Sequence, residues 1–258
     1  MTTVPFPHYE ARLFDGGIID QLHRTGAVLI RDLDVNDNRA LLTICQFIGR
    51  PTQARNPDAE SRGIVEDGFV HRVEALLSPL KDRHGAAVLS TTNLEFQLHT
   101  DEFFADNPAE VVLLHCVRSA QDGGASIFSV VNDIVPLLSA GAIDQLMNSF
   151  FPAGNSLVHL LWRKEGNWNA RFNPYELSYA VGALSKDQRS AISMFEHVAT
   201  ACSFRMALEP GDCLIWLNHR MVHGRESFGP GQERLLKRVR LHVNDPRGMR
   251  AFSGSGGS

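Results

Sequence analysis

Residues 93–101 (NLEFQLHTD) carry a polar side chain at every odd position. Successive side chains of a β-strand point to opposite faces, so this alternation predicts a strand with one polar face. That face ends in His99 and Asp101, which are both residue types that bind metals. On a strand, a spacing of two directs an imidazole and a carboxylate toward the same point. The stretch therefore predicts a strand that carries a binding site, and not only a surface that faces water.

The rest of the chain contains many short strand patterns. They lie at 26–31, 111–117, 126–131, 212–217 and 235–243, with further strands expected in 159–163 and 170–180 around an insertion. Helical patterns lie at 18–25, 36–48 (with an Asn cap), 132–150 and 185–200. This order favours an α+β, mainly β fold, with a double-stranded β-helix (jelly-roll) core, flanking helices and a substrate-lid insertion. A doubly wound parallel sheet would need regular strand–helix alternation and usually a glycine-rich nucleotide loop, which the sequence lacks.

Composition narrows the class of protein further. The chain has 258 residues, 43% hydrophobic and 21% charged, as expected of a soluble globular protein. A net charge of −4, without a basic run interleaved with aromatics, argues against nucleic acid as a partner. No apolar run has membrane-spanning length and no signal-peptide layout is visible, so we expect a cytoplasmic protein. We expect one domain over residues 1–252 and a disordered Gly/Ser tail over 253–258, and the sequence leaves homo-oligomerisation open.

A metal held by His99 and Asp101 needs a third ligand. His223 is the best candidate, because it follows the predicted strand 212–217 and precedes Gly224, which suits a turn. His219 is the second choice, and would compete if this stretch were helical. Two histidines and one carboxylate would form the facial triad of non-haem iron(II) oxygenases, with three coordination positions open. His-x-Asp also occurs by chance and a lone histidine is usually structural, so the triad is a hypothesis.

Basic residues recur on the last predicted strand. Arg234 and Arg238 would share one face of it with Arg240. An arginine that points into a barrel is costly unless it meets an anion, and a carboxylate is its natural partner. The alternative is an outward basic stripe, because Lys237 lies on the other face of the same strand.

A glycine pair precedes the predicted strand at 126–131. Gly123 and Gly124 suit a tight turn that leads into a strand. Ser126 would then offer its hydroxyl to the same carboxylate that Arg234 binds.

The order of these motifs resembles the taurine dioxygenase/clavaminate synthase-like superfamily of iron(II)- and 2-oxoglutarate-dependent oxygenases. LHTDEFF (98–104) is followed by GGAS (123–126), then by VHGR (222–225) and by an arginine eleven residues after its histidine. GAVLIRDL (26–33) also resembles the opening strand of that superfamily. The resemblance covers most of residues 20–243. It implies Fe(II) as the metal, 2-oxoglutarate as cosubstrate and O2 as oxidant.

The resemblance also implies roles for single residues. The implied metal ligands are His99, Asp101 and His223. Arg234 and Ser126 are the implied binding residues for the far carboxylate of 2-oxoglutarate, and Ser126 stands where the family usually has Thr. Arg238 is implied to lie near the cosubstrate or an anionic group of the substrate. Halogenases of the superfamily have Gly or Ala where this chain has Asp101, so we expect hydroxylation and not chlorination.

The substrate site is less constrained. Glu95 and Gln97 share the predicted metal-facing side, where Glu95 would suit an amine. Phe103 and Phe104 would wall the pocket, or simply join the core. The resemblance adds Arg225 and Asn173, the latter in place of an Asp that binds the substrate amine in relatives. We expect a small polar substrate, such as a free amino acid, hydroxylated at an unactivated C–H with release of succinate and CO2.

Other outcomes remain open. The same chemistry can end in desaturation, cyclisation or epimerisation. A cupin-like metal-dependent hydrolase or isomerase would use the same ligands, but would not need Arg234 and Ser126 to hold a dicarboxylate. A non-catalytic metal- or ligand-binding protein is the third class.

Overall fold

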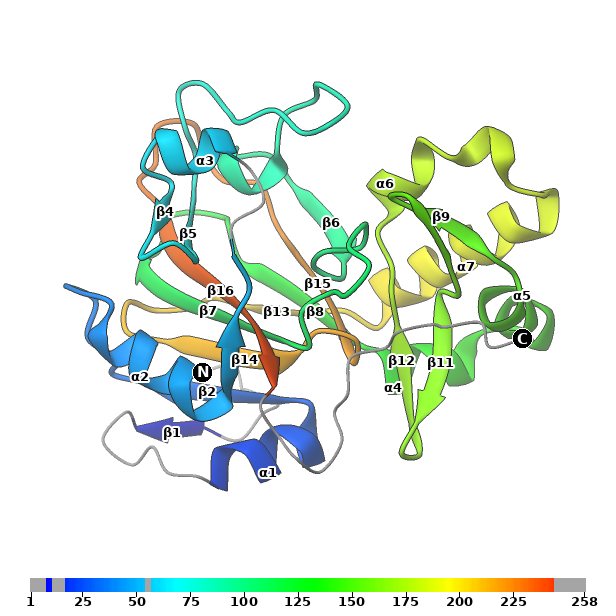
Figure 1. The fold of residues 1–258 in the computed structure, drawn as a ribbon, viewed down its shortest axis with the longest axis horizontal. Helices are drawn as coiled ribbons and strands as arrows, with labels where there is room; N and C mark the ends of the chain where they lie inside the picture. The colour runs from blue at the N-terminus through cyan, green and yellow to red at the C-terminus, as the bar shows by residue number, and fades with distance from the viewer. Residues whose placement is uncertain (1–7, 11–16, 54–56, 244–258) are drawn as a thin grey trace.

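The structure is a computed structural model that describes residues 8–10, 17–53 and 57–243, and all statements below refer to these residues. The predicted tail, 253–258, lies outside them. Two main β-sheets face each other, and helices cover their outer faces (Figure 1). The fold is therefore mixed and strand-rich, as the sequence predicts.

The larger sheet has eight strands in the order β1-β2-β14-β7-β16-β5-β4, with β3 paired to β16. Its strands are β1 His8–Glu10, β2 Ala27–Arg31, β3 Gly49–Pro51, β4 Val65–Glu66, β5 Val70–Glu74, β7 Val111–Arg118, β14 Cys213–Leu217 and β16 Leu235–Val243. All pairs are antiparallel except β1 with β2. The central strands β7 and β14 read as continuous apolar runs because both of their faces are buried.

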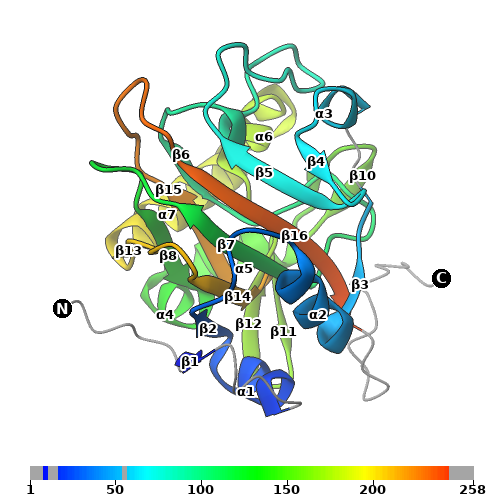
Figure 2. The same cartoon turned by 90° about the vertical axis from the view of Figure 1, so that its left-hand side faces the viewer.

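Helices α1 (Gly17–Thr25) and α2 (Arg39–Ile48) cover the outer face of the larger sheet (Figure 2). The short helix α3 spans Pro57–Ser61. The helix predicted from residue 36 begins at Arg39, and the expected Asn cap is wrong. Asn38 stands at the cap position, but its amide donates to Glu66 instead of receiving a helix N–H.

The smaller sheet has the order β13-β8-β15-β6 and is antiparallel throughout. Its strands are β6 Phe96–His99, β8 Ser126–Val130, β13 Phe204–Met206 and β15 Met221–Arg225. An apolar layer that includes Leu114, Phe128, Trp216 and Leu236 fills the space between the two sheets. This layer fixes the distance between β16 on one sheet and β6 and β15 on the other.

A second helical layer covers the outer face of the smaller sheet (Figure 1). It contains α4 Val131–Ile134, α5 Ala140–Asn148, α6 Pro174–Ser178, α7 Lys186–Ala201 and the hairpins β9 Phe151–Ala153 with β10 Ser156–Val158 and β11 Leu161–Lys164 with β12 Asn167–Ala170. Three 3-10 helices span Leu89–Thr91, Val135–Leu137 and Val181–Ala183.

The helix predicted over 132–150 is divided, because the Ser139 side chain caps a new helix by accepting from the Ala142 N–H.

The strand predicted over 170–180 is wrong beyond its first residue. The Asn173 side chain accepts from the Glu176 N–H at 3.2 Å, and Pro174 occupies the first turn of α6. An Asn cap followed by Pro is a strong helix start, and it overrides the strand-like pattern. Among the described residues, no helix combines the length and apolarity needed to cross a membrane.

Candidate metal centre

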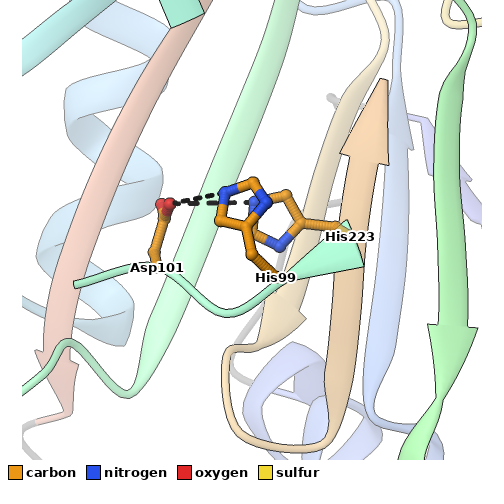
Figure 3. Close-up of side chains that lie close together, drawn as sticks. All are labelled: His99, Asp101 and His223. Atoms are coloured by element: carbon orange, nitrogen blue, oxygen red, sulfur yellow. Dashed lines mark ion pairs between the residues drawn. The ribbon is translucent and has the colours of Figure 1, made fainter. Parts of the chain in front are cut away.

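Three buried side chains meet at the edge of the smaller sheet (Figure 3). His99 ends β6, Asp101 follows two residues later in a turn, and His223 lies on β15 directly opposite His99. Asp101 Oδ1 lies 3.6 Å from His99 Nε2 and 3.7 Å from His223 Nε2. Within the described part of the chain, this is the one group of three or more His, Cys, Asp or Glu ligand atoms that lie within 4.8 Å of one another.

His223 lies in the middle of a strand, and the turn expected at Gly224 is wrong. The turn comes earlier, at residues 218–220. Gly224 continues the strand, where an added Cβ would lie 2.4 Å from the Phe96 carbonyl oxygen. The rival ligand His219 is outside the group, and its ring lies against Trp162 at 5.2 Å.

A β-bulge changes which side chains of β6 face the site. His223 pairs with His99 and Arg225 with Phe96, so three steps along β6 match two along β15. The bulge brings Phe96 to the side of His99, where their rings stack at 3.9 Å. Gln97 and Glu95 are exposed instead. The alternation predicted over residues 93–101 is therefore wrong, and Glu95 and Gln97 do not line the cavity at the metal centre.

The charge states of Asp101 and His223 fit a divalent cation. Burial alone would raise the pKa of Asp101, but Arg238 and Arg240 hold that pKa well below its usual range, so the carboxylate is ionised. Burial and then His99 lower the pKa of His223 well below its usual range, so that imidazole is neutral. His99 Nδ1 lies 2.8 Å from the Gln97 carbonyl oxygen, which assigns its proton to that nitrogen. His99 Nε2 is buried without a hydrogen-bond partner, as expected of a metal-ligating atom.

Two residues that support Asp101 were not predicted. Arg240 Nε donates to Asp101 Oδ2 at 2.9 Å. Asn218 Oδ1 accepts from the Asp101 N–H at 2.9 Å, and its Nδ2 donates to the Asp101 carbonyl at 3.0 Å. Arg240 could have been predicted, because it shares a face of the last strand with Arg234 and Arg238. No local pattern in the sequence marks Asn218.

A cavity adjoins the metal centre. Its polar lining consists of His99, His223, Ser90, Ser126, Arg225, Arg234 and Arg238. The structure therefore brings the two predicted arginines and Ser126 together beside the histidines. The buried guanidinium groups of Arg225 and Arg234, with the nearby Arg238, favour an anionic occupant, because an uncompensated buried charge is costly.

Arg234 reaches the cavity from just before β16. Its Nε donates to the Gly124 carbonyl at 3.1 Å, and its Nη1 is buried without a partner. Burial lowers its pKa to about 10, so it stays charged at neutral pH. Gly124 has φ +68°, and an added Cβ would lie 3.1 Å from Arg234 Cδ. The glycine is therefore required both by the turn and by the close approach of the arginine.

Arg225 joins the same cavity from β15. Its Nη2 donates to the carbonyls of Leu89 and Leu94, and its Nε is buried without a partner. Burial and then Arg234 lower the pKa of Arg225 to about 10. This residue therefore links the cavity to the loop that precedes β6.

The other predicted substrate residues lie outside the lining of this cavity. Phe103 is buried in the core behind the smaller sheet, which is the second of the two places expected for it. Phe104 is 40% exposed and lies 5.3 Å from the Arg83 guanidinium. Asn173 caps α6, and that role accounts for its side chain.

Two facing sheets with a buried two-histidine, one-carboxylate group have the ligand pattern of the mononuclear facial-triad class. A family profile matches residues 3–146 and 152–240. The chain belongs to the taurine catabolism dioxygenase TauD, TfdA family, which confirms the resemblance found in the sequence.

A curated protein is similar to this chain in sequence. Dioxygenase str8 of Strobilurus tenacellus is 27% identical over 161 residues, which are 56% of this chain and 38% of that protein. The chain thus spans well under half the length of this curated relative.

Solved structures show the same fold. Asparagine oxygenase (AsnO) has a TM-score of 0.71 at 18% identity, covering 90% of this chain and 80% of that one. The non-heme iron oxygenase OrfP, in complex with Fe and alpha-ketoglutaric acid, has a TM-score of 0.66 at 20% identity, covering 92% and 82%. PvcB of Pseudomonas aeruginosa has a TM-score of 0.64 at 18% identity, covering 93% and 84%.

Proposed function

We propose that this protein is an Fe(II)- and 2-oxoglutarate-dependent dioxygenase that hydroxylates a small polar substrate. One observation carries the proposal: His99, Asp101 and His223 converge beside a cavity that also contains the unpaired Nη1 of Arg234. Membership of the TauD, TfdA family supports it. We further propose that the two facing sheets form a double-stranded β-helix, that residues 1–252 are one catalytic domain, and that the segment around α6 is the lid.

In this proposal His99, Asp101 and His223 hold Fe(II). Bound iron and 2-oxoglutarate together would supply the activation of O2 that oxidises a C–H bond and releases succinate and CO2. Arg234 and Ser126 would bind the far carboxylate of 2-oxoglutarate as a charge-assisted pair. The Trp216 ring, 4.8 Å from the His223 ring, keeps that side of the centre apolar. The protein's contribution is thus to position the cosubstrate and to exclude water.

We propose a free amino acid or a similar small molecule as the substrate. The names of two structural neighbours support this class, since AsnO is called asparagine oxygenase and OrfP is complexed with (3S)-hydroxy-L-Arg in another structure. Arg238 lines the cavity and would meet an anionic group such as the substrate carboxylate. Glu95 no longer supports an amine site, because its side chain is exposed.

The test is an anaerobic titration of the protein with Fe(II) and 2-oxoglutarate, followed through the visible metal-to-ligand charge-transfer band. We expect the band in the wild type, and weaker 2-oxoglutarate binding in Arg234→Ala. The matched control is Arg118→Ala, which removes an arginine that is half exposed and pairs only with the exposed Glu233. No band in a metal-loaded wild type would refute the proposal, and would favour the hydrolase or isomerase class. A second measurement, succinate formation from 2-oxoglutarate under air, tests turnover directly: succinate establishes it, and its absence excludes it.

A further inference from the structure

The two oxygens of the Asp101 carboxylate have different surroundings. Oδ1 faces the point where the imidazoles converge, 3.6 Å from His99 Nε2 and 3.7 Å from His223 Nε2. Oδ2 instead accepts a hydrogen bond from Arg240 Nε at 2.9 Å. The carboxylate therefore turns Oδ1 toward the metal centre, where it also accepts from Arg238 Nη1 at 3.3 Å, and turns Oδ2 toward Arg240.

Arg240 serves this contact and does not line the cavity. Its neighbour on the same face of β16, Arg238, does line the cavity and makes a longer contact of 3.3 Å with Asp101 Oδ1. The side chain of Arg240 is only 14% exposed, so water cannot easily replace it behind the carboxylate. Arg238 thus faces the ligand space, whereas Arg240 lies behind the metal ligand.

The backbone of Asp101 is fixed as well. Asn218, which is fully buried, accepts from the Asp101 N–H and donates to the Asp101 carbonyl. With the backbone held at both polar groups, rotation about the side-chain bonds is the freedom that remains to the carboxylate. Arg240 opposes that rotation, because it would break a charge-assisted hydrogen bond in a buried site.

We propose that Arg240 is a positioning residue that holds Asp101 as a one-oxygen metal ligand. The inference rests on the proposed function and deepens it. A carboxylate can bind a metal through one oxygen or through two. A facial triad keeps three positions open only when its carboxylate uses one. By holding Oδ2, Arg240 preserves the position that a second carboxylate oxygen would fill, which a chelating 2-oxoacid needs.

The experiment compares Arg240→Met with Lys237→Met. Lys237 is the matched control, because it is a buried cation three positions before Arg240 on β16, paired with Glu66 at 3.0 Å on the opposite face. Both substitutions remove a buried charge from one strand, so a purely structural effect would be similar in the two. Cobalt(II) is the probe, because its visible absorption reports the ligands and geometry around the metal without turnover. The affinity for 2-oxoglutarate is then measured on each cobalt-loaded protein.

We expect Arg240→Met to bind cobalt(II) with an altered visible absorption spectrum, because the second carboxylate oxygen would take the place of a solvent ligand. We also expect it to bind 2-oxoglutarate about tenfold more weakly, since a lost outer contact to a metal ligand costs about 10- to 100-fold in metal affinity or activity. Lys237→Met should match the wild type in both respects. A wild-type cobalt spectrum and wild-type 2-oxoglutarate affinity in Arg240→Met would overturn the inference.

Two further outcomes are separable. If Arg240→Met does not fold, Arg240→Gln replaces it in the experiment. This variant keeps a polar group in the strand but removes the cation. Its cobalt spectrum should change in the same way as that of Arg240→Met. Wild-type spectra there would equally overturn the inference. A wild type that binds cobalt(II) but not 2-oxoglutarate would refute the proposed function, and the spectra of the variants would still decide the role of Arg240.

Discussion

The contact between Gly124 and Arg234 predicts a selective loss of cosubstrate binding in Gly124→Ala. The residue adopts φ +68°, and an added Cβ would lie 3.1 Å from Arg234 Cδ and 3.2 Å from its Nε. A methyl group there would press on the guanidinium stem and on its hydrogen bond to the Gly124 carbonyl. The substitution therefore acts on the turn and on the arginine together.

The two effects have separate magnitudes. A residue with a Cβ in the left-handed region costs about 1–2 kcal/mol, which lowers the free energy of unfolding. A displaced arginine weakens a charge-assisted hydrogen bond worth about 1.5–3 kcal/mol. At about 1.4 kcal/mol for each factor of ten, the affinity for 2-oxoglutarate should fall by roughly 10- to 100-fold.

Gly166→Ala separates these two effects. Gly166 has φ +77° in the turn between β11 and β12, and an added Cβ would meet nothing within 4 Å. Both variants should lose similar stability in chemical denaturation, but only Gly124→Ala should lose 2-oxoglutarate affinity, measured by calorimetry. Equal cosubstrate affinities in the two variants would refute the placement of Arg234 at the cosubstrate.

Three shorter predictions follow from the same geometry. Asn218→Ala leaves the Asp101 N–H without its partner, which should cost about 1–3 kcal/mol in unfolding and weaken cobalt(II) binding in a direct titration; unchanged values of both would contradict the role of this amide. Glu95→Gln should leave the KM for the substrate unchanged, because this side chain is exposed, and a several-fold rise would return it to the substrate site. Phe195→Ala should lower the free energy of unfolding by about 3–5 kcal/mol, whereas the partly exposed Met194→Ala should change it little.

The meeting of the three candidate metal ligands could be predicted because their chemistry is marked by residue type. His99 and Asp101 lie two positions apart, and His223 follows the buried strand β14 after a short turn. Continuous apolar runs likewise predicted the central strands, since burial on both faces leaves few polar positions. Burial and metal binding each restrict the residue type at the position itself, so both can be inferred from the sequence.

The bulge in β6 could not be predicted from its own residues. An extra residue in a strand is defined by the partner strand, here by the pairing of Arg225 with Phe96. The one trace of it in the sequence is Gly224, whose missing Cβ allows the Phe96 carbonyl to approach. In contrast, Asn173 and Pro174 mark the start of α6 in the sequence, because an Asn cap followed by Pro outweighs the strand-like pattern around them.

The charges of the cavity predict how the protein responds to its cosubstrate. Arg225, Arg234 and Arg238 line the cavity, and the Asp101 carboxylate, which contacts Arg238, is shared with Arg240. Burial lowers the pKa of all three cavity arginines to about 10, which is the direction expected of buried cations that lack a full counter-charge. An anion should therefore stabilise the fold even before a metal is present.

This stabilisation should depend on the far carboxylate of the ligand. At 100 times its Kd, a ligand adds about 2.7 kcal/mol, which raises Tm by roughly 5–10 °C in a chain of this size. In metal-free protein, 2-oxoglutarate should raise Tm more than pyruvate does at the same concentration, because pyruvate has no second carboxylate to reach Arg234. Arg234→Ala should remove that difference, whereas Arg118→Ala should keep it. Equal shifts for the two ligands in the wild type would mean that the cavity arginines do not form the far-carboxylate site.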